Sequence, residues 1–287
     1  MKVKKAVILA AGFGSRMLPA TKAVPKEMLT IADKPSIQYI VEELAASGIS
    51  DILIVLSRGK NAVQEHFDRA PELEAALIEN PEKKALYDSI VKITSLADIT
   101  YIRQPIMRGS GSAVLLAKNF AGSEPFVVVY PDDIMTGETP VTAQICAAYE
   151  KYGLGAVAMK EFPVRDIMKY SSLDAELIED NIYKITDMIE KPSEKEILTN
   201  FSILGRCVLP AKIFKLLEET KPGLNNEIWL TDAMKRLSNE DGMTGVDFIG
   251  KRYDTGNKLG LMKCVTEIAL SHPEIGEDYK KYLKELL

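Results

Sequence analysis

Short apolar runs alternate with amphipathic segments along the first half of the chain. The runs rich in Val and Ile are "KAVILAA", "DILIVLS", "ITYIRQ", "PFVVVYPDD" and "GAVAMKEF". Runs of this length are typical of buried strands, and the segments between them have the spacing of helices that cover a parallel sheet. The pattern therefore predicts an α/β fold with a mixed, mostly parallel central sheet flanked by helices.

The first helix is well marked in the sequence. Ile37, Ile40 and Leu44 fall on one face of a helix, and Gly48 follows as a stop signal. This assignment places residues 12–26 in the loop between the first strand and the first helix. In open parallel sheets such loops lie beyond the carboxyl ends of the strands, where ligands bind.

Two later stretches, "AELIEDNIYKITDMIEKP" and "FSILGRCVL", look like strands without the same helical alternation. The centre of the chain therefore departs from a regular double winding. We expect residues 155–220 to form a subregion laid on the same sheet. No repeat, low-complexity tract or Pro/Gly-rich linker divides the chain.

Composition restricts the possible partners. The chain has 287 residues and a formal net charge of −5, so no global basic field gathers nucleic acid or an anionic membrane surface. No stretch approaches the ~18 apolar residues that a membrane span needs. We therefore expect neither a nucleic acid nor a membrane as a partner. Cys146, Cys207 and Cys264 are widely spaced, lack zinc spacing, and are typical of buried apolar positions in a cytoplasmic protein.

The stretch "AVILAAGFGSRMLPATKAVPKEML" runs from an apolar strand into a glycine turn and then into basic residues. The turn begins like a dinucleotide fingerprint, but Met17 stands where a third Gly is required, and the next strand ends without a ribose-binding acid. The Gly-Lys-Ser/Thr ending of a P-loop is also missing. Bound phosphate must therefore contact backbone amides together with Arg16 and Lys26. The alternative is a tight turn with solvated cations.

Two adjacent carboxylates follow the apolar strand in "VVVYPDDI". Asp132 and Asp133 repel each other there unless a cation or hydrogen-bond donors compensate. One interpretation is that the pair binds a hard metal ion. The other is that one Asp caps a helix or closes a turn.

The motif "GFGSRMLPATKAVPKEML" closely resembles the signature of the bacterial UTP–glucose-1-phosphate uridylyltransferases, a branch of the sugar-1-phosphate nucleotidyltransferases. That signature reads G-x-G-T/S-R-x-L-P-x-T-K and then P-K-E-M-L. The resemblance continues in the family's order through "DKPSIQYIVEELAASGI", "YIRQ", "GSGSAVLLA", "YPDDI", "IEKP", "LGRCVL", "NNEIWLTDA" and "YDTGNKLGLM". It covers nearly the whole chain.

The resemblance implies a fold and an activity. The fold would be a single Rossmann-like nucleotidyltransferase domain over residues 1–287, with a nucleotide-binding part at 1–154, a sugar-phosphate-binding part at 155–220 and a C-terminal part at 221–287. The activity would be Mg²⁺-dependent transfer of a uridylyl group from UTP to glucose 1-phosphate in a homodimer or homotetramer. Another sugar 1-phosphate, dTTP, or a binding paralogue without turnover are alternatives. A dehydrogenase is disfavoured by the incomplete dinucleotide motif.

The resemblance also assigns roles to individual residues. The nucleotide would contact Ala11, Gly12, Gly14, Glu27, Gln104 and Gly109, with Glu27 and Gln104 at the uracil edge. The sugar phosphate would contact Ser171, Glu190 and Lys191. Arg16, Lys26 and Lys191 would be catalytic through their charge, and Asp132 and Asp254 would bind Mg²⁺.

Three positions depart from the family pattern. Ser171 replaces a Gly whose backbone approaches the sugar, Ser112 replaces a His, and Trp229 replaces a Gln. A hydroxyl and a Cβ at position 171 could crowd the sugar or form a new bond to it. The departure at position 171 therefore concerns the acceptor sugar and not uridylyl transfer itself.

Overall fold

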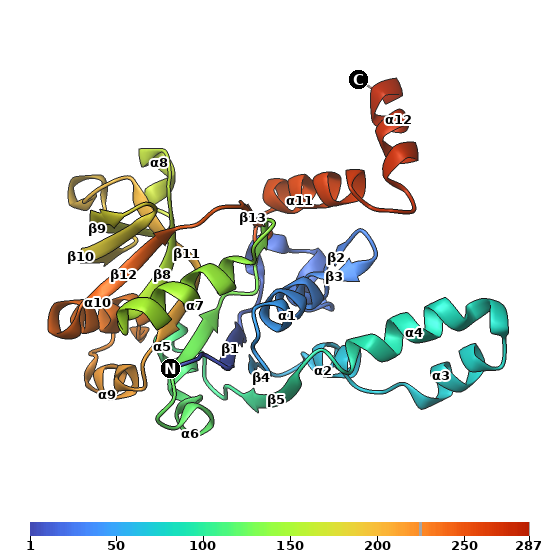
Figure 1. Cartoon of the computed structure of the whole chain (residues 1–287), viewed down its shortest axis with the longest axis horizontal. Coiled ribbons are helices and arrows are strands. Elements are labelled where there is room, and N and C mark those ends of the chain that lie inside the picture. Colours follow the sequence, from blue (N-terminus) through green and yellow to red (C-terminus); the bar gives the residue numbers. More distant parts are fainter. Residues whose placement is uncertain (224–225, 287) are drawn as a thin grey trace.

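The computed structural model describes residues 1–223 and 226–286. Its centre is a nine-stranded sheet in the order β5-β4-β1-β6-β11-β8-β12-β10-β9 (Figure 1). β11 and β10 run against the direction that the other strands share. The strand bounds are β1 Lys5–Ala10, β4 Asp51–Leu56, β5 Asp98–Arg103, β6 Phe126–Val129, β8 Gly155–Glu161, β9 Ser171–Glu179, β10 Ile182–Glu190, β11 Phe201–Leu209 and β12 Met243–Asp247. The predicted fold class is confirmed.

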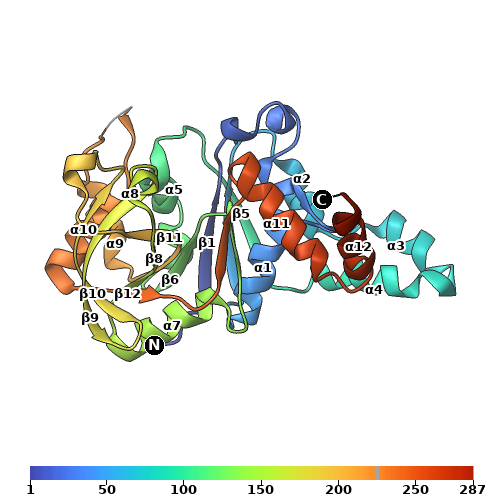
Figure 2. The same ribbon diagram turned by 90° about the horizontal axis from the view of Figure 1, so that it is seen from above.

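Helices cover both faces of this sheet (Figure 2). Their bounds are α1 Ser36–Ala46, α2 Asn61–Phe67, α3 Pro71–Ile78, α4 Lys84–Ile93, α5 Gly109–Leu115, α6 Lys118–Ala121, α7 Val141–Tyr152, α8 Val164–Ile167, α9 Lys212–Glu219, α10 Leu230–Asp241, α11 Lys258–Leu270 and α12 Gly276–Leu286. Two small antiparallel pairs join β2 Thr30–Ile31 to β3 Lys34–Pro35, and β7 Asp133–Thr136 to β13 Lys251–Asp254. Among the described helices, none combines the length and apolar character needed to cross a membrane.

The composition of β1 follows from its central place in the sheet. Ala6 and Ile8 point to the face covered by α1 and α7, whereas Val7 and Leu9 point to the face covered by α5, α9 and α10. Because successive side chains of a strand alternate between faces, a strand buried on both needs an apolar residue at every position. The glycine turn begins within two residues of the carboxyl end of this buried strand.

The local predictions for the first helix and the central strands are confirmed. α1 begins at Ser36 and ends two residues before Gly48, whose φ of +81° suits a glycine after a helix. β9 and β10 form an antiparallel hairpin, and β11 lies antiparallel between β6 and β8. The predicted departure from double winding arises from these strands. All three cysteines are buried and free.

Candidate functional site

The glycine turn after β1 folds back on the loop that carries Lys26. Gly14 has a φ of +70°, and a Cβ at this position would lie only 3.0 Å from Cβ of Lys26. Its carbonyl accepts a 2.8 Å hydrogen bond from the Thr21 hydroxyl. A side chain at position 14 would therefore be strained and crowded. The turn thus brings Lys26 close to Gly14, four residues after the end of β1.

The two cations of this loop point at one carboxylate from a distant part of the chain. Lys26 Nζ donates to Asp132 Oδ2 at 2.8 Å, and Arg16 Nη2 lies 3.2 Å from the same oxygen. Arg16 Nη1 also lies 3.9 Å from Asp254 Oδ2. The structure thus brings together four residues that the sequence analysis assigned to phosphate or metal binding.

Charge pairing sets the protonation of this group. Burial alone would raise the pKa of the Asp132 carboxyl, but the ammonium of Lys26 and the guanidinium of Arg16 hold that pKa below its usual range. Burial would likewise lower the pKa of Lys26, but Asp132 and Glu27 raise it above its ordinary value. Both groups therefore stay charged at neutral pH.

The short β7–β13 ladder carries Asp254 to Asp132. Asp254 is paired in register with Asp133, and the backbone N–H of Thr255 donates to the carbonyl of Asp132 at 2.8 Å. A Cβ on Gly256 would lie 2.7 Å from Asp132 Oδ2 and 3.0 Å from Asp254 Oδ1, so both carboxylates converge on one point. This convergence depends on a glycine at position 256.

The donor set suits a small divalent cation. Within residues 1–223 and 226–286, no group of three or more His, Cys, Asp or Glu side chains could hold a metal alone. Mg²⁺ in nucleotide sites takes one or two carboxylates and completes its shell with phosphate oxygens and water. Asp132 and Asp254 therefore fit a metal that arrives with a triphosphate.

Asp133 has a different environment from its neighbour. Its Oδ1 accepts hydrogen bonds from the guanidinium of Arg252, with Nε at 2.6 Å and Nη2 at 2.5 Å. Burial raises the pKa of Asp133 to about 6, although Arg252 opposes the shift. Arg252, which sequence reasoning missed, thus occupies this carboxylate. In the sequence, the only feature that marks Arg252 is its position two residues before Asp254.

The residues predicted for the uracil edge form two polar clusters near the ends of β1 and β5. Lys60 Nζ lies 2.7 Å and 2.9 Å from the two Glu27 oxygens and donates to the carbonyl of Ala10 at 2.6 Å. Burial raises the pKa of Glu27 and lowers that of Lys60. Glu27 and Lys60 are both buried. Lys60 was missed from the sequence, because a lysine after a strand usually lies in solvent.

The second cluster joins Gln104 to α5. Gln104 Nε2 donates to Ser112 Oγ at 2.9 Å, and the same hydroxyl donates to the carbonyl of Gly109 at 2.9 Å. Gly109 has a φ of +86°, and a Cβ there would lie 2.6 Å from the carbonyl oxygen of Ile228. Ser112, one of the three departures, therefore links two residues that were predicted to contact the nucleotide.

The end of the β9–β10 hairpin carries the residues predicted for the sugar phosphate. Glu190 Oε2 accepts a 2.7 Å hydrogen bond from the Thr231 hydroxyl, and burial raises the pKa of Glu190. Lys191 has a φ of +45°, and its Nζ lies 5.7 Å from the centre of the Trp229 ring. Trp229 is fixed in turn by a 3.0 Å hydrogen bond from its Nε1 to Glu227.

The hydroxyl of Ser171 is engaged with the neighbouring strand. Its Oγ lies 3.3 Å from Ser202 Oγ and accepts a hydrogen bond from the backbone N–H of Ile203 at 3.0 Å. Ser171 is buried. Its side chain thus has partners in β11, and the residue still lines the cavity described next.

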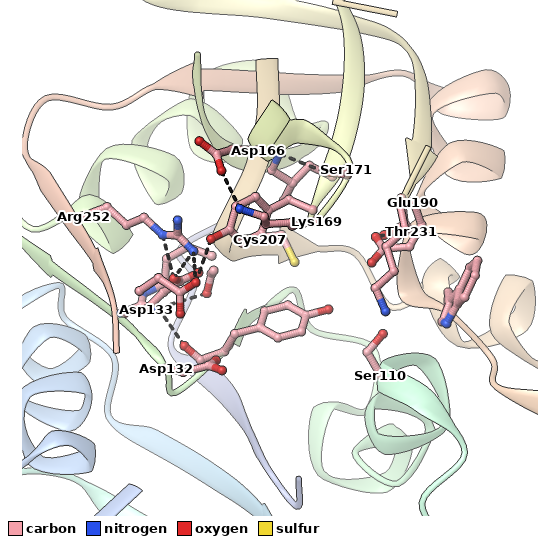
Figure 3. Close-up of a pocket in the computed structure, with 18 of the residues that line it drawn as sticks. Ser110, Asp132, Asp133, Asp166, Lys169, Ser171, Glu190, Cys207, Thr231 and Arg252 are labelled. Carbon is pink, nitrogen blue, oxygen red and sulfur yellow. Dashed lines mark hydrogen bonds and ion pairs between the residues drawn. The ribbon is translucent and has the colours of Figure 1, made fainter. Parts of the chain in front are cut away.

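One cavity of about 1090 Å³ joins these groups. Asp132, Asp133 and Arg252 lie on one side of it, and Glu190, Thr231 and Ser110 lie on the other (Figure 3). We call Arg16, Asp132 and Asp254 the carboxylate wall, together with Lys26, which contacts Asp132 but does not itself line the cavity. We call Glu190, Lys191, Trp229 and Thr231 the hairpin wall. The predicted nucleotide contacts at Ala11, Gly12, Gly14, Glu27, Gln104 and Gly109 are not among the residues that line this cavity.

Comparison with known proteins identifies the class. The sequence profile described as nucleotidyl transferase matches residues 5–270. The chain therefore belongs to the nucleotidyl transferase family. It is 45% identical, over 99% of both chains, to a protein of Staphylococcus epidermidis named UTP–glucose-1-phosphate uridylyltransferase. A Bacillus subtilis protein of the same name is 44% identical over 100% of this chain and 96% of its own. The family resemblance of the motifs is confirmed.

Solved structures agree with this assignment. A UDP-glucose pyrophosphorylase complexed with UDP-glucose superposes with a TM-score of 0.86 at 36% identity, covering 94% of this chain and 100% of that chain. A UTP-bound enzyme of the same kind from Acinetobacter baumannii gives a TM-score of 0.88 at 34% identity, covering 99% and 100%.

Proposed function

We propose that the protein transfers a uridylyl group from UTP to glucose 1-phosphate, giving UDP-glucose and pyrophosphate. The observation that carries the proposal is that one continuous cavity is lined by both the carboxylate wall and the hairpin wall. One wall offers carboxylates and cations suited to a metal–triphosphate, and the other offers a carboxylate for sugar hydroxyls and an ammonium for a phosphate. Relatives at 44–45% identity, which are named UTP–glucose-1-phosphate uridylyltransferases, support the same substrates.

In this proposal a phosphate oxygen of glucose 1-phosphate attacks the α-phosphorus of UTP in line. The bond from the α-phosphorus to the oxygen that bridges to the β-phosphorus breaks, and pyrophosphate leaves with that electron pair. No protein nucleophile is needed, because the attacking oxygen is already anionic. Catalysis then consists of alignment and charge neutralisation.

Arg16 and Lys26 hold the triphosphate beside the α-phosphorus, and Lys191 holds the attacking phosphate. Asp132 and Asp254 would hold Mg²⁺, and the bound metal would supply charge neutralisation for the triphosphate and for the pyrophosphate that leaves. Lys26 and Arg16 already contact the Asp132 carboxylate, which keeps that side chain ionised and oriented for the cation.

The remaining assignments divide recognition between the two substrates. Ala11, Gly12, Gly14, Glu27, Gln104 and Gly109 serve the nucleotide, and Ser171 and Glu190 serve the sugar. With residues 1–287 as one domain, we assign nucleotide binding to 1–154, sugar-phosphate binding to 155–220, and the second metal ligand to 221–287. We further propose a cytoplasmic homodimer or homotetramer.

The test is pyrophosphate release with Mg²⁺ across UTP, dTTP and CTP, each paired with glucose, galactose and mannose 1-phosphates. We expect the highest kcat/KM for UTP with glucose 1-phosphate. A higher value for another pair would move the substrate assignment to that pair. Binding of UDP-glucose without pyrophosphate release from any pair would show a binding paralogue instead.

A further inference from the structure

Tyr170 lies where the two walls of the cavity meet. It lies three residues after the end of α8 and directly precedes Ser171, the first residue of β9. Its backbone N–H donates to the carbonyl of Ile167 at 2.9 Å, which closes the turn after α8. The residue lines the cavity together with Asp254 and Lys191.

The hydroxyl of Tyr170 acts on the carboxylate wall. It donates a 2.7 Å hydrogen bond to Asp254 Oδ2. Asp254 Oδ1 meanwhile accepts from the backbone N–H of Gly256 at 3.0 Å. Each carboxylate oxygen thus has one donor, which fixes the rotation of the group. The same oxygen that Tyr170 contacts lies 3.9 Å from Arg16 Nη1.

The ring of Tyr170 is itself held in place. Its centre lies 4.8 Å from the guanidinium carbon of Arg252 and 5.6 Å from the centre of the Phe162 ring. Arg252 is bound by Asp133, as described above. A cation stacked on an aromatic face restrains both groups. The hydroxyl therefore reaches Asp254 from a ring that cannot swing freely.

The backbone of Tyr170 acts on the hairpin wall. Its carbonyl accepts a 2.7 Å hydrogen bond from the backbone N–H of Lys191. Lys191 has the left-handed φ of +45°, which is unfavourable for a residue other than glycine and needs support from its surroundings. The bond to Tyr170 provides such support at the point where the chain leaves β10.

We propose that Tyr170 is a positioning residue that fixes Asp254 relative to Lys191. The metal-bound triphosphate and the acceptor phosphate are thereby held in the relative position that the in-line attack requires. The proposal deepens the proposed function and rests on it. A residue that only packed the turn after α8 would contribute through its ring and would not need its hydroxyl. The hydroxyl is therefore the group to test.

Tyr170→Phe removes the hydroxyl and keeps the ring and the backbone. Tyr152→Phe is a matched control, because the Tyr152 hydroxyl bonds the Glu179 carboxylate outside the lining of the cavity. Tyr170→Leu removes the hydroxyl and the ring together. Mn²⁺ binding, followed by electron paramagnetic resonance, is measured for each protein with α,β-methylene-UTP, which cannot be cleaved. Steady-state kinetics and the thermal unfolding midpoint are measured alongside.

We expect Tyr170→Phe to weaken Mn²⁺ binding about 10-fold. This is the lower end of the loss in metal affinity, about 10- to 100-fold, that follows removal of a group that orients a metal ligand. Its kcat should fall by a similar factor, while its KM for glucose 1-phosphate and its unfolding midpoint stay near wild type. Tyr152→Phe should match the wild type in every measurement. Tyr170→Leu should show the same loss of Mn²⁺ affinity with a lower midpoint.

Wild-type Mn²⁺ affinity and kcat in Tyr170→Phe would overturn the proposal, and so would a loss confined to Tyr170→Leu. A rise in the KM for glucose 1-phosphate alone would also overturn it, by making Tyr170 a sugar contact. The Mn²⁺ titration needs no turnover. If the wild type released no pyrophosphate, the proposed function would be wrong, but the Mn²⁺ titration would still show whether the Tyr170 hydroxyl contributes to metal binding.

Discussion

On the carboxylate wall, the charges of Arg16 and Lys26 are directed at Asp132, whereas on the hairpin wall the ammonium of Lys191 lies over the ring of Trp229. Within the described part of the chain, Lys191 forms no ion pair. Lys26 is partly buried and Lys191 is exposed. The two walls thus hold their cations in opposite states of pairing.

The difference indicates how each wall meets its ligand. On the carboxylate wall, two cations and two carboxylates balance each other. We therefore expect a divalent cation that binds with a triphosphate to offset part of the negative charge that the triphosphate adds. We expect Lys26 and Arg16 then to exchange their contacts with Asp132 for contacts with phosphate. On the hairpin wall, Lys191 has no carboxylate to release, and a phosphate can pair with it directly.

The largest effect should come from breaking the carboxylate wall. Asp132→Asn or Asp254→Asn should lower kcat/KM at least ~100-fold, about 2.7 kcal/mol of transition-state stabilisation, because each removes a ligand for the cation that accompanies the triphosphate. Pyrophosphate release as a function of Mg²⁺ concentration is the measurement. Asp88→Asn, in an exposed ion pair on α4, is the control. Near-normal Mg²⁺-dependent rates in both variants would defeat the metal assignment.

The next effect should separate the two walls. Lys191→Ala should raise the KM for glucose 1-phosphate about 10-fold or more, in line with the ~1.5–3 kcal/mol of a hydrogen bond to a charged group. Its Kd for UTP should stay near the wild-type value. Lys26→Ala should weaken UTP binding instead, which a sugar-free calorimetric titration measures. Equal weakening of UTP binding in the two variants would remove the division of roles.

Local patterns were sufficient for the framework of the fold. The apolar runs predicted β1 and β4, because every position of these strands after the first is buried and apolar. The spacing of Ile37, Ile40 and Leu44 predicted α1. The glycine turn with Arg16 and Lys26 could also be predicted as a phosphate site, because the turn and its charges lie in one short stretch of the sequence.

Contacts between distant segments were not visible in this way. Asp254 reaches Asp132 through the β7–β13 ladder, and only the family resemblance pointed to it. Lys60 is buried against Glu27, yet nothing in the residues around it separates it from a solvated lysine. Tyr170 owes its importance to three segments that meet around it. Such roles depend on tertiary packing, which local spacing does not encode.

A smaller effect should sharpen the description of the nucleotide side. Gln104→Ala should narrow the preference for UTP over CTP by about 1–2 kcal/mol, because a buried hydrogen-bonding group discriminates between bases whereas charge does not. Arg16→Ala should lower kcat/KM for all three triphosphates by a similar factor. The comparison is kcat/KM for UTP, dTTP and CTP in both variants. An unchanged base ranking in Gln104→Ala would remove this residue from the uracil edge.

The smallest effect concerns the ring that holds Lys191. Trp229→Gln introduces the residue that the family usually has at this position, and it removes the aromatic face under the ammonium. A cation–π contact at an exposed site contributes about 0.5–1 kcal/mol, so the KM for glucose 1-phosphate should rise about two- to fivefold with kcat nearly unchanged. Trp229→Phe keeps an aromatic face and should lie between the two. If the KM effect of Trp229→Gln persists in a Lys191→Ala background, the ring contacts the sugar itself. If it disappears there, the ring acts through Lys191, by positioning the ammonium that has no carboxylate partner among the described residues.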